Sequence, residues 1–142
     1  MLKLGDTFLL PTVKNPTEHL WVVITERNPK THEAVCVNIT KIKKWTTRAD
    51  MTLELSPGIH EFVTLPSVVY YKDARIMLLN LVEQMLVAQK EKVVCVQLGP
   101  CSAELLVLIR SKMAISSAKN IIKEKCRLEW EAKGLLPPAT HS

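Results

Sequence analysis

Two histidines, His19 and His60, are the side chains of this sequence best suited to acid–base chemistry near neutral pH. Cleavage of a ribonucleotide chain through its 2′-hydroxyl needs one group that removes the hydroxyl proton and another that protonates the leaving oxygen. His19 stands at the entry of a predicted strand and His60 follows the Pro57-Gly58 turn, so a closed barrel would place both near one rim. The simpler interpretation of each is a partly exposed rim histidine that is hydrogen-bonded to the backbone.

A hydroxyl and an amide share one face of the strand predicted over residues 34–42. Asn38 and Thr40 are two positions apart, so their side chains point to the same side of the strand. Together they would bind a phosphate oxygen or a developing negative charge. An equally good interpretation is the satisfied polar face of a half-solvated strand. Thr40 joins His19 and His60 as a candidate catalytic residue.

Basic side chains surround a tryptophan in the next stretch of the chain. Basic groups neutralise phosphates, and an indole ring stacks on an unpaired base. The alternative is a basic loop beside one packed tryptophan. In the predicted strand over residues 67–71, Tyr70 and Tyr71 point to opposite faces, so one belongs to the core and the other lines a groove. The candidate RNA-binding residues are Asn38, Lys41, Lys43, Lys44, Trp45, Arg48 and Tyr70.

Motifs for several other chemistries do not occur in the sequence. It contains no Walker loop, no G-x-G-x-x-G, no G-x-S-x-G and no H-E-x-x-H. Asp6, Asp50 and Asp73 have no metal-ligand spacing, and the last two stand where turn and cap residues belong. The four cysteines include no C-x-x-C pair and are expected to be reduced and structural. We therefore expect no metal and no cofactor.

The first half of the chain reads as short strands divided by turn signals. Strands are predicted over residues 6–10, 19–25, 34–42, 52–55, 59–63 and 67–71. Their length and spacing favour a small antiparallel barrel over a parallel sheet.

The hydrophobic period changes in the second half. Leu78, Leu81, Val82 and Met85 form the stripe of an amphipathic helix over residues 74–90. Residues 93–98 are ambiguous between loop and strand. Further helices are predicted over residues 103–113, with Ser102 as N-cap, and 118–131, capped by Ser116 or Ser117. The expected organisation is a barrel over residues 1–72, a helical extension packed on it over 73–134 and a flexible tail over 135–142.

The order of these features resembles the MazF/PemK-like toxin family. The match covers about residues 1–72 and rests on Gly5-Asp6, on residues 19–25 and on Val37 to Thr40. The resemblance implies an SH3-like barrel and cytosolic cleavage of single-stranded RNA without a metal. The RNA-cleaving members of that family use an Arg at the entry of the second strand and a Ser or Thr at the end of the third. Thr40 matches the latter, whereas the Arg position falls on or near His19.

The fold class predicted is therefore α+β, a small antiparallel SH3-like β-barrel followed by about three helices. The function expected is binding or cleavage of RNA, as a toxin–antitoxin or phage-defence component with an antitoxin or other partner protein and as a homodimer. The alternative is a non-catalytic module that binds protein or DNA, in which residues 103–131 form a helix-turn-helix presenting Lys119, Asn120, Lys123, Lys125 and Arg127.

Composition permits a nucleic-acid partner without demanding one. The net charge is +5 and the pI is about 9.1. The positive charge is divided between both halves of the chain. No apolar run reaches the length of a membrane span, and the first residues lack a signal-peptide pattern. We expect a cytoplasmic protein with no membrane partner.

Overall fold

The computed structural model describes residues 1–11, 18–87 and 95–136. Within these ranges the chain forms six strands, three α-helices and one 3₁₀ turn. The strands are β1 (Thr7–Pro11), β2 (Glu18–Val23), β3 (Glu33–Lys41), β4 (Glu54–Leu55), β5 (Ser67–Leu78) and β6 (Val96–Leu98). The helices are η1 (Arg48–Met51), α1 (Leu79–Val87), α2 (Ala103–Met113) and α3 (Asn120–Ala132).

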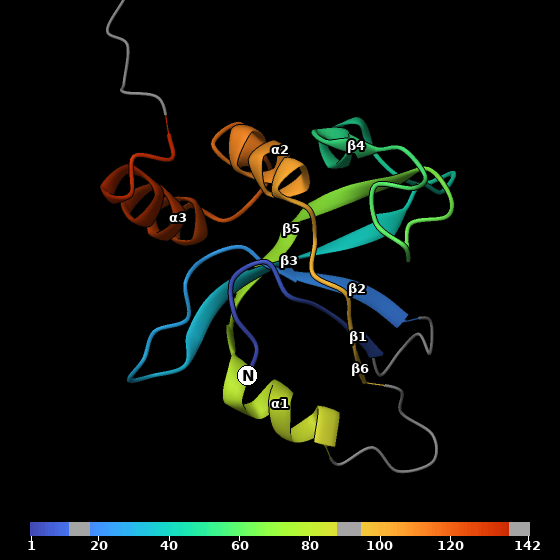
Figure 1. Cartoon of the computed structure of the whole chain (residues 1–142). Helices are drawn as coiled ribbons and strands as arrows, with labels where there is room; N and C mark the ends of the chain where they lie inside the picture. Colours follow the sequence, from blue (N-terminus) through green and yellow to red (C-terminus); the bar gives the residue numbers. More distant parts are fainter. Residues whose placement is uncertain (12–17, 88–94, 137–142) are drawn as a thin grey trace, which may run out of the picture.

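All six strands belong to one antiparallel sheet in the order β4-β5-β3-β2-β1-β6. The sheet curls into a half-barrel, with α2 and α3 over one face and α1 on the other (Figure 1). The predicted α+β class, a barrel-like antiparallel sheet with helices after it, is confirmed. No helix in the described ranges is long and apolar enough to span a bilayer.

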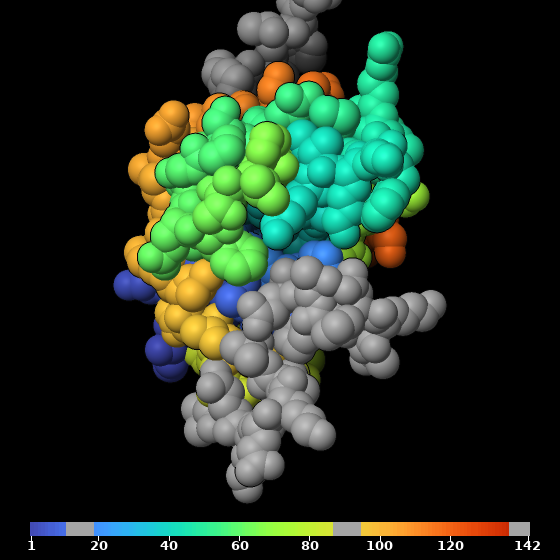
Figure 2. Space-filling model, turned by 90° about the vertical axis from the view of Figure 1, so that its right-hand side faces the viewer, coloured from blue at the N-terminus to red at the C-terminus, as the bar shows by residue number. Residues whose placement is uncertain are grey.

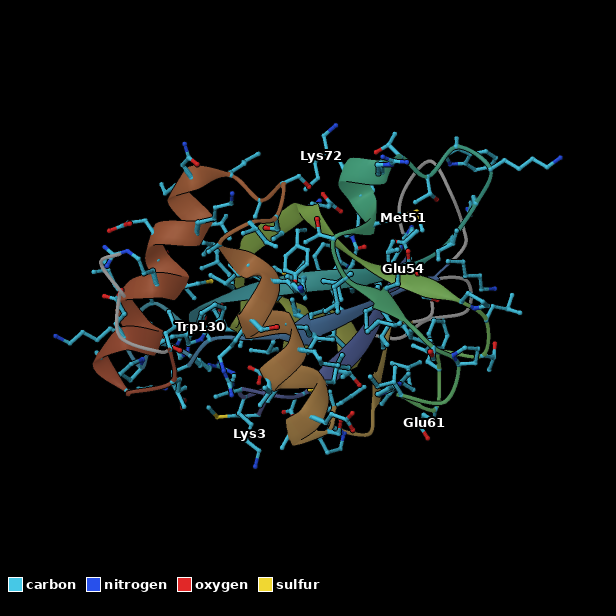
Figure 3. All side chains as sticks on the ribbon, turned by 90° about the horizontal axis from the view of Figure 1, so that it is seen from above. Lys3, Met51, Glu54, Glu61, Lys72 and Trp130 are labelled. Carbon is cyan, nitrogen blue, oxygen red and sulfur yellow. The ribbon has the colours of Figure 1, made fainter. Side chains whose placement is uncertain are left out.

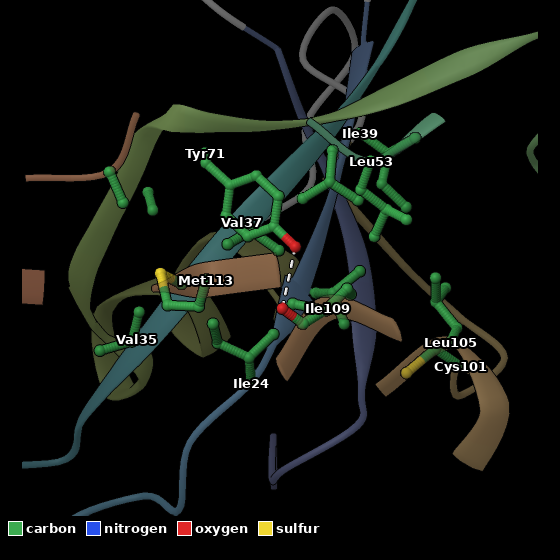
Figure 4. Packing of buried hydrophobic residues seen from close by; sticks show 14 of the residues in the cluster. Ile24, Val35, Val37, Ile39, Leu53, Tyr71, Cys101, Leu105, Ile109 and Met113 are labelled. Carbon is green, nitrogen blue, oxygen red and sulfur yellow. Dashed lines mark hydrogen bonds between the residues drawn. The ribbon is translucent and has the colours of Figure 1, made fainter. Parts of the chain in front are cut away.

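Each face of the sheet has its own apolar core, because successive strand residues point to opposite sides. Leu20, Val22 and Val37 face α2 and α3, whose buried side chains include Leu105, Ile109 and Trp130. Phe8, Trp21 and Val23 face the other way, toward Leu79 and Val82 of α1. Figure 4 shows the first core, where the buried hydroxyl of Tyr71 donates a 2.8 Å hydrogen bond to the Ile109 carbonyl of α2.

The segment predicted as a strand over residues 59–63 is a loop. Two backbone hydrogen bonds close its turns. The Gly58 amide donates to the Val63 carbonyl at 2.8 Å, and the Val63 amide donates to the His60 carbonyl at 2.9 Å. The strand before it, predicted over residues 52–55, is only Glu54–Leu55. Thr52 instead has helical backbone as the C-cap of a 3₁₀ turn over residues 48–51, which a Thr47–Asp50 capping box closes. Glu61, at the outer edge of the loop in Figure 3, accepts a 3.2 Å hydrogen bond from the Gly99 amide.

The last predicted strand of the first half continues beyond the predicted boundary at residue 72. β5 runs to Leu78 because an irregularity opposite Val37 lets its second part pair again with β3, with Arg75 opposite Cys36. α1 is therefore shorter than predicted and its buried side is different. Leu79 and Val82 are buried, whereas Leu81 and Met85 of the predicted stripe are 48% and 44% exposed.

The later elements follow the sequence prediction closely. Val96–Leu98 is a strand that pairs with β1, which returns the second half of the chain to the sheet. Ser102 caps α2 by accepting a 3.1 Å hydrogen bond from the Leu105 amide. The prediction that Ser116 or Ser117 caps α3 is wrong, because the helix begins at Asn120 after Lys119, which makes no side-chain cap hydrogen bond. Ser116 Oγ instead accepts a 3.2 Å hydrogen bond from the Ala118 amide in the turn between the helices. Seen from above, α2 (orange) lies over the strands and α3 (red, with Trp130) lies beside it (Figure 3). Most of the predicted tail, residues 137–142, lies outside the described residues.

Candidate nucleic-acid groove

Most of the candidate residues from the sequence line one hollow of about 230 Å³. We call it the Trp45 groove. It is lined by His19, Thr40, Lys41, Lys43, Trp45, Thr46, Asp50, Val68 and Tyr70. A second hollow of about 310 Å³ shares His19, Thr40, Lys41 and Lys43 with it and extends to residues 62–65 and Ser67. Figure 2 shows the side of the molecule on which the segments around residues 41–50 (cyan) and 58–66 (green) lie next to each other.

Strand register brings these side chains onto one face of the sheet. Trp21 of β2 is opposite Asn38 of β3, and Asn38 is opposite Tyr70 of β5. His19 and Thr40 are each two residues from a member of this row, so they point to the same side. The sequence predicted the shared face of Asn38 and Thr40; the pairing of β2 and β5 on either side of β3 places His19 and Tyr70 beside it.

The loop after β3 holds Trp45 in the open. The Lys43 amide donates to Thr46 Oγ1 at 2.8 Å, and the Thr46 amide donates to the Lys43 carbonyl at 3.0 Å. This closed turn leaves the Trp45 side chain 74% exposed. The Lys43 Nζ lies 5.3 Å from the centre of the indole ring, within cation–π range. The alternative of a packed tryptophan in this loop is therefore wrong.

The cations in and beside this loop form no salt bridge with a described carboxylate, although Asp50 also lines the groove. Among the described residues, none of Lys41, Lys43, Lys44 and Arg48 takes part in a salt bridge. Lys41 and Lys43 line the groove, whereas Lys44 and Arg48 are exposed on the same loop and do not line it. The groove therefore offers two cations at its wall and two more beside it.

His19 is half-buried at the groove wall. Partial burial is the largest influence on its ring and lowers its pKa from the ordinary value of 6.5. The negative charge of Asp73 opposes this effect and the positive charge of Lys43 adds to it. His19 therefore favours the neutral imidazole at pH 7, which is the form that accepts a proton.

Thr40 belongs to a chain of side-chain hydrogen bonds that leads away from the groove. Its hydroxyl lies 2.8 Å from Asn38 Oδ1, and Asn38 Nδ2 lies 2.7 Å from Asp73 Oδ2. Asp73 is also paired with Arg75, whose guanidinium lies 5.1 Å from the centre of the Trp21 ring. Asn38 is only 3% exposed and does not line the groove. The expectation that Asn38 contacts a phosphate is wrong, because its amide is buried and bonded to Asp73.

His60 is separated from the other two catalytic candidates. It is buried and lines a different hollow, beside Gly58, Gly99 and Pro100. Its Nδ1 accepts a 3.1 Å hydrogen bond from the Phe62 amide, and its Nε2 lies 3.2 Å from Thr7 Oγ1 and 3.0 Å from the Gly99 carbonyl.

These contacts fix the His60 tautomer. The Phe62 N–H can only donate, so Nδ1 must accept and carries no proton. The proton is therefore on Nε2, which donates to the Gly99 carbonyl; the Thr7 hydroxyl also donates its own hydrogen to that carbonyl, at 2.6 Å. The ring joins the 58–63 loop to β1 and to the segment after β6. The expected convergence of His60 with His19 and Thr40 in one groove is not found.

The basic face of the predicted helix-turn-helix is largely neutralised by acidic neighbours. Arg127 pairs with Glu124 and, at 2.8 Å, with Glu131. Lys125 lies 3.9 Å from Glu33. Lys119 and Lys123 are the members of that set without a salt bridge among the described residues. This set therefore keeps two unpaired cations in the described part of the chain, against four in and beside the loop after β3.

Two acidic residues at or near the groove were not among the sequence candidates. Asp50, interpreted as a turn residue, lines the groove and closes the capping box of the 3₁₀ turn with Thr47. Asp73 was interpreted as a cap residue before the helix predicted from residue 74. This interpretation is wrong, because Asp73 lies inside β5, where the strand irregularity brings its carboxylate to Asn38. No spacing rule relates residue 73 to residue 38. Among the described residues no group of three metal-ligating side chains comes together.

No protein-family model, curated protein or solved structure matches this chain.

Proposed function

We propose that this protein binds single-stranded RNA in the Trp45 groove. The observation that carries the proposal is the Trp45 indole, 74% exposed on a closed turn between basic residues that have no salt-bridge partner among the described residues. Aromatic side chains presented beside basic groups are the stacking platforms on which unpaired nucleic-acid strands bind. An indole with cations on either side matches a nucleotide, whose base stacks on the ring and whose phosphates meet the charges.

The geometry favours an unpaired strand over a duplex. Stacking on Trp45 needs a base whose face is free, and bases in a helix are already stacked on their neighbours. The groove has a volume of about 230 Å³ and shares four lining residues with the neighbouring hollow of about 310 Å³. It suits one or two nucleotides lying across the ends of β2 and β3 better than the wide face of a double helix.

The binding proposal is tested with fluorescein-labelled single-stranded RNA and two charge-reversed proteins. Lys41→Glu/Lys43→Glu alters the groove wall, and Lys119→Glu/Lys123→Glu makes the same change of net charge on α3. The groove variant should bind far more weakly at every salt concentration, and its affinity should vary less with salt, because each lost phosphate contact removes about 0.7 from the slope of log K against log salt. The α3 variant should resemble the wild type.

The comparison of the two variants also decides between the groove and the helix-turn-helix. Greater loss of affinity in the α3 variant, with duplex DNA preferred over RNA, would establish the alternative module. Equal RNA affinity of the wild type and both variants would contradict the proposal that RNA binds in the Trp45 groove.

A second candidate function is cleavage of the bound strand without a metal. The observation that favours it is His19, a histidine with a lowered pKa on the wall of the same groove. Neutral His19 would take the 2′-hydroxyl proton, the 2′-oxygen would attack the adjacent phosphorus, and the 5′-oxygen would leave with a proton from the Lys43 ammonium. The resemblance to MazF/PemK-like toxins favours this activity, and a place in a toxin–antitoxin or phage-defence pair stays a prediction.

Cleavage is tested in EDTA with wild type, His19→Gln and His60→Gln. Loss of the rate in His19→Gln alone would support the mechanism, since His60 lies outside the groove. A rate shared by all three proteins would assign the activity to a contaminating nuclease. RNA that stays intact while bound would leave the protein as a binding module.

A further inference from the structure

The hydrogen bonds between Thr40, Asn38 and Asp73 can run in one direction only. A carboxylate accepts hydrogen bonds and donates none, so the atom of Asn38 that faces Asp73 Oδ2 at 2.7 Å must be its NH₂ group. The other end of the Asn38 amide is then its carbonyl oxygen, which also only accepts. The Thr40 hydroxyl, 2.8 Å from this oxygen, must be the donor.

A hydroxyl has a single hydrogen, so the direction of this chain decides what Thr40 presents to the groove. With its hydrogen given to Asn38, Thr40 Oγ1 has only lone pairs left for a ligand. We propose that Asp73 is the positioning residue of the Trp45 groove: acting through Asn38, it fixes Thr40 as a hydrogen-bond acceptor. The ligand must then place a hydrogen-bond donor at this point.

This inference rests on RNA binding in the groove and specifies the chemistry at one position of it. A phosphate oxygen cannot bond to Thr40, because it too is an acceptor; phosphates go to Lys41 and Lys43 instead. The donors that a nucleotide offers are the ribose 2′-hydroxyl and the N–H groups of the base. Either would meet Thr40, and a single experiment separates them.

Oligouridine is the sharpest probe, because each nucleotide carries two donors, the 2′-hydroxyl and the base N3–H. Three short single-stranded ligands are compared by fluorescence anisotropy: oligouridine, its 2′-O-methyl form and its N3-methyl form. Wild-type protein should bind one of the methylated ligands about three- to tenfold more weakly than oligouridine, the effect of losing one neutral hydrogen bond. The identity of the weaker ligand names the donor. A 2′-fluoro oligouridine, which keeps the ribose pucker but has no donor, controls for shape in the ribose arm.

Variants then test whether Thr40 and Asp73 cause the preference. Thr40→Val should bind all three ligands alike, and Thr40→Ser, which keeps the hydroxyl, should keep the preference. Asp73→Asn should weaken the preference, because two facing amides can be paired in either direction. The exchange Asn38→Asp/Asp73→Asn should restore it, since the carboxylate introduced at position 38 again only accepts from Thr40. Glu54→Gln on β4 removes one exposed carboxylate outside the groove and should change nothing.

The results separate the inference from the proposed function. Oligouridine binding with equal affinity for both methylated forms, or a preference that survives in Thr40→Val, would overturn the role of Thr40. A preference unchanged in Asp73→Asn would overturn the role of Asp73. An absence of binding by every ligand would overturn the proposed function, and the inference with it. Thermal unfolding of each variant shows that the compared proteins are folded.

Discussion

The Lys43 ammonium lies 5.3 Å from the centre of the Trp45 ring, on an indole that is otherwise open to solvent. Trp45 is still 74% exposed with this contact in place, so most of its surface stays open to a ligand. It also places a positive charge beside the surface on which a base would stack, so that stacking and phosphate attraction act on the same nucleotide.

Trp45→Ala should weaken RNA binding by about 1–3 kcal/mol, the usual effect of removing one stacking aromatic. The free energy of unfolding should change by less than about 0.5 kcal/mol, because the side chain packs on no core. Both are measured on the same preparations, by anisotropy and by urea denaturation. Trp45→Phe, which keeps a smaller ring, should fall between the two proteins in affinity.

Intrinsic fluorescence gives an independent test of the same residue. Of the three tryptophans, Trp21 and Trp130 are 4% and 2% exposed, whereas Trp45 is 74% exposed. RNA should therefore quench the red-shifted part of the emission, and Trp45→Ala should show no quenching. Quenching that persists in Trp45→Ala would place the RNA elsewhere.

His60→Ala should lower the free energy of unfolding by about 1–3 kcal/mol, because the Phe62 amide loses its acceptor and the buried ring no longer links the loop to Thr7 and Gly99. RNA affinity of the folded variant should equal that of the wild type. Thr7→Val removes a hydroxyl from the same network, so the double variant His60→Ala/Thr7→Val should destabilise less than the sum of the single changes. Strict additivity would contradict the network.

The sequence predicted the fold best where one local pattern determined the structure. The alternation of Val35, Val37 and Ile39 identified β3 and its buried face, and Ser102 identified the start of α2. The sequence-based prediction was wrong where tertiary contacts compete with the local pattern. Residues 59–63 have strand-like composition, but the His60 ring is bonded inside a loop instead. β5 passes through Asp73 because pairing with β3 resumes beyond the irregularity.

The groove could be predicted in part for the same reason. The clustering of lysines around Trp45 is visible in the sequence, and the shared face of Asn38 and Thr40 follows from strand alternation. The hydrogen bonds that Asn38 and Thr40 make cannot be predicted in this way, because they depend on Asp73. That residue is far away in sequence and is brought to Asn38 by a strand irregularity. The position of His60 depends on long-range contacts with Thr7 and Gly99 that no spacing indicates.

The buried cysteines should react slowly with thiol reagents in the folded protein. Burial raises the pKa of Cys101 to about 11 and that of Cys126 to about 12, and it raises the pKa of Cys36 as well. Only the thiolate is reactive, so at pH 8 these groups are almost entirely in the unreactive form. Ellman's reagent should modify them quickly only after denaturation. Rapid modification of Cys36, Cys101 or Cys126 in native buffer would contradict the packing of the core.

The last prediction concerns the titration of His19. Because burial lowers its pKa below 6.5 in the folded state, the unfolded chain takes up the proton first as the pH falls. The contribution of His19 to the free energy of unfolding is therefore constant above pH 6.5, decreases as the pH falls toward the lowered pKa, and is fully lost below it. The difference in unfolding free energy between wild type and His19→Gln should show this dependence, measured by urea denaturation at a series of pH values.

Ring NMR titrations resolve the causes of the lowered His19 pKa. Lys43→Gln should raise the His19 pKa, because it removes a positive neighbour, and Asp73→Asn should lower the pKa further, because it removes a negative one. Glu54→Gln, outside the groove, is the control for loss of a carboxylate. A His19 pKa above 6.5 in the wild type, or one that neither Lys43→Gln nor Asp73→Asn changes, would mean that His19 is not held between these two charges.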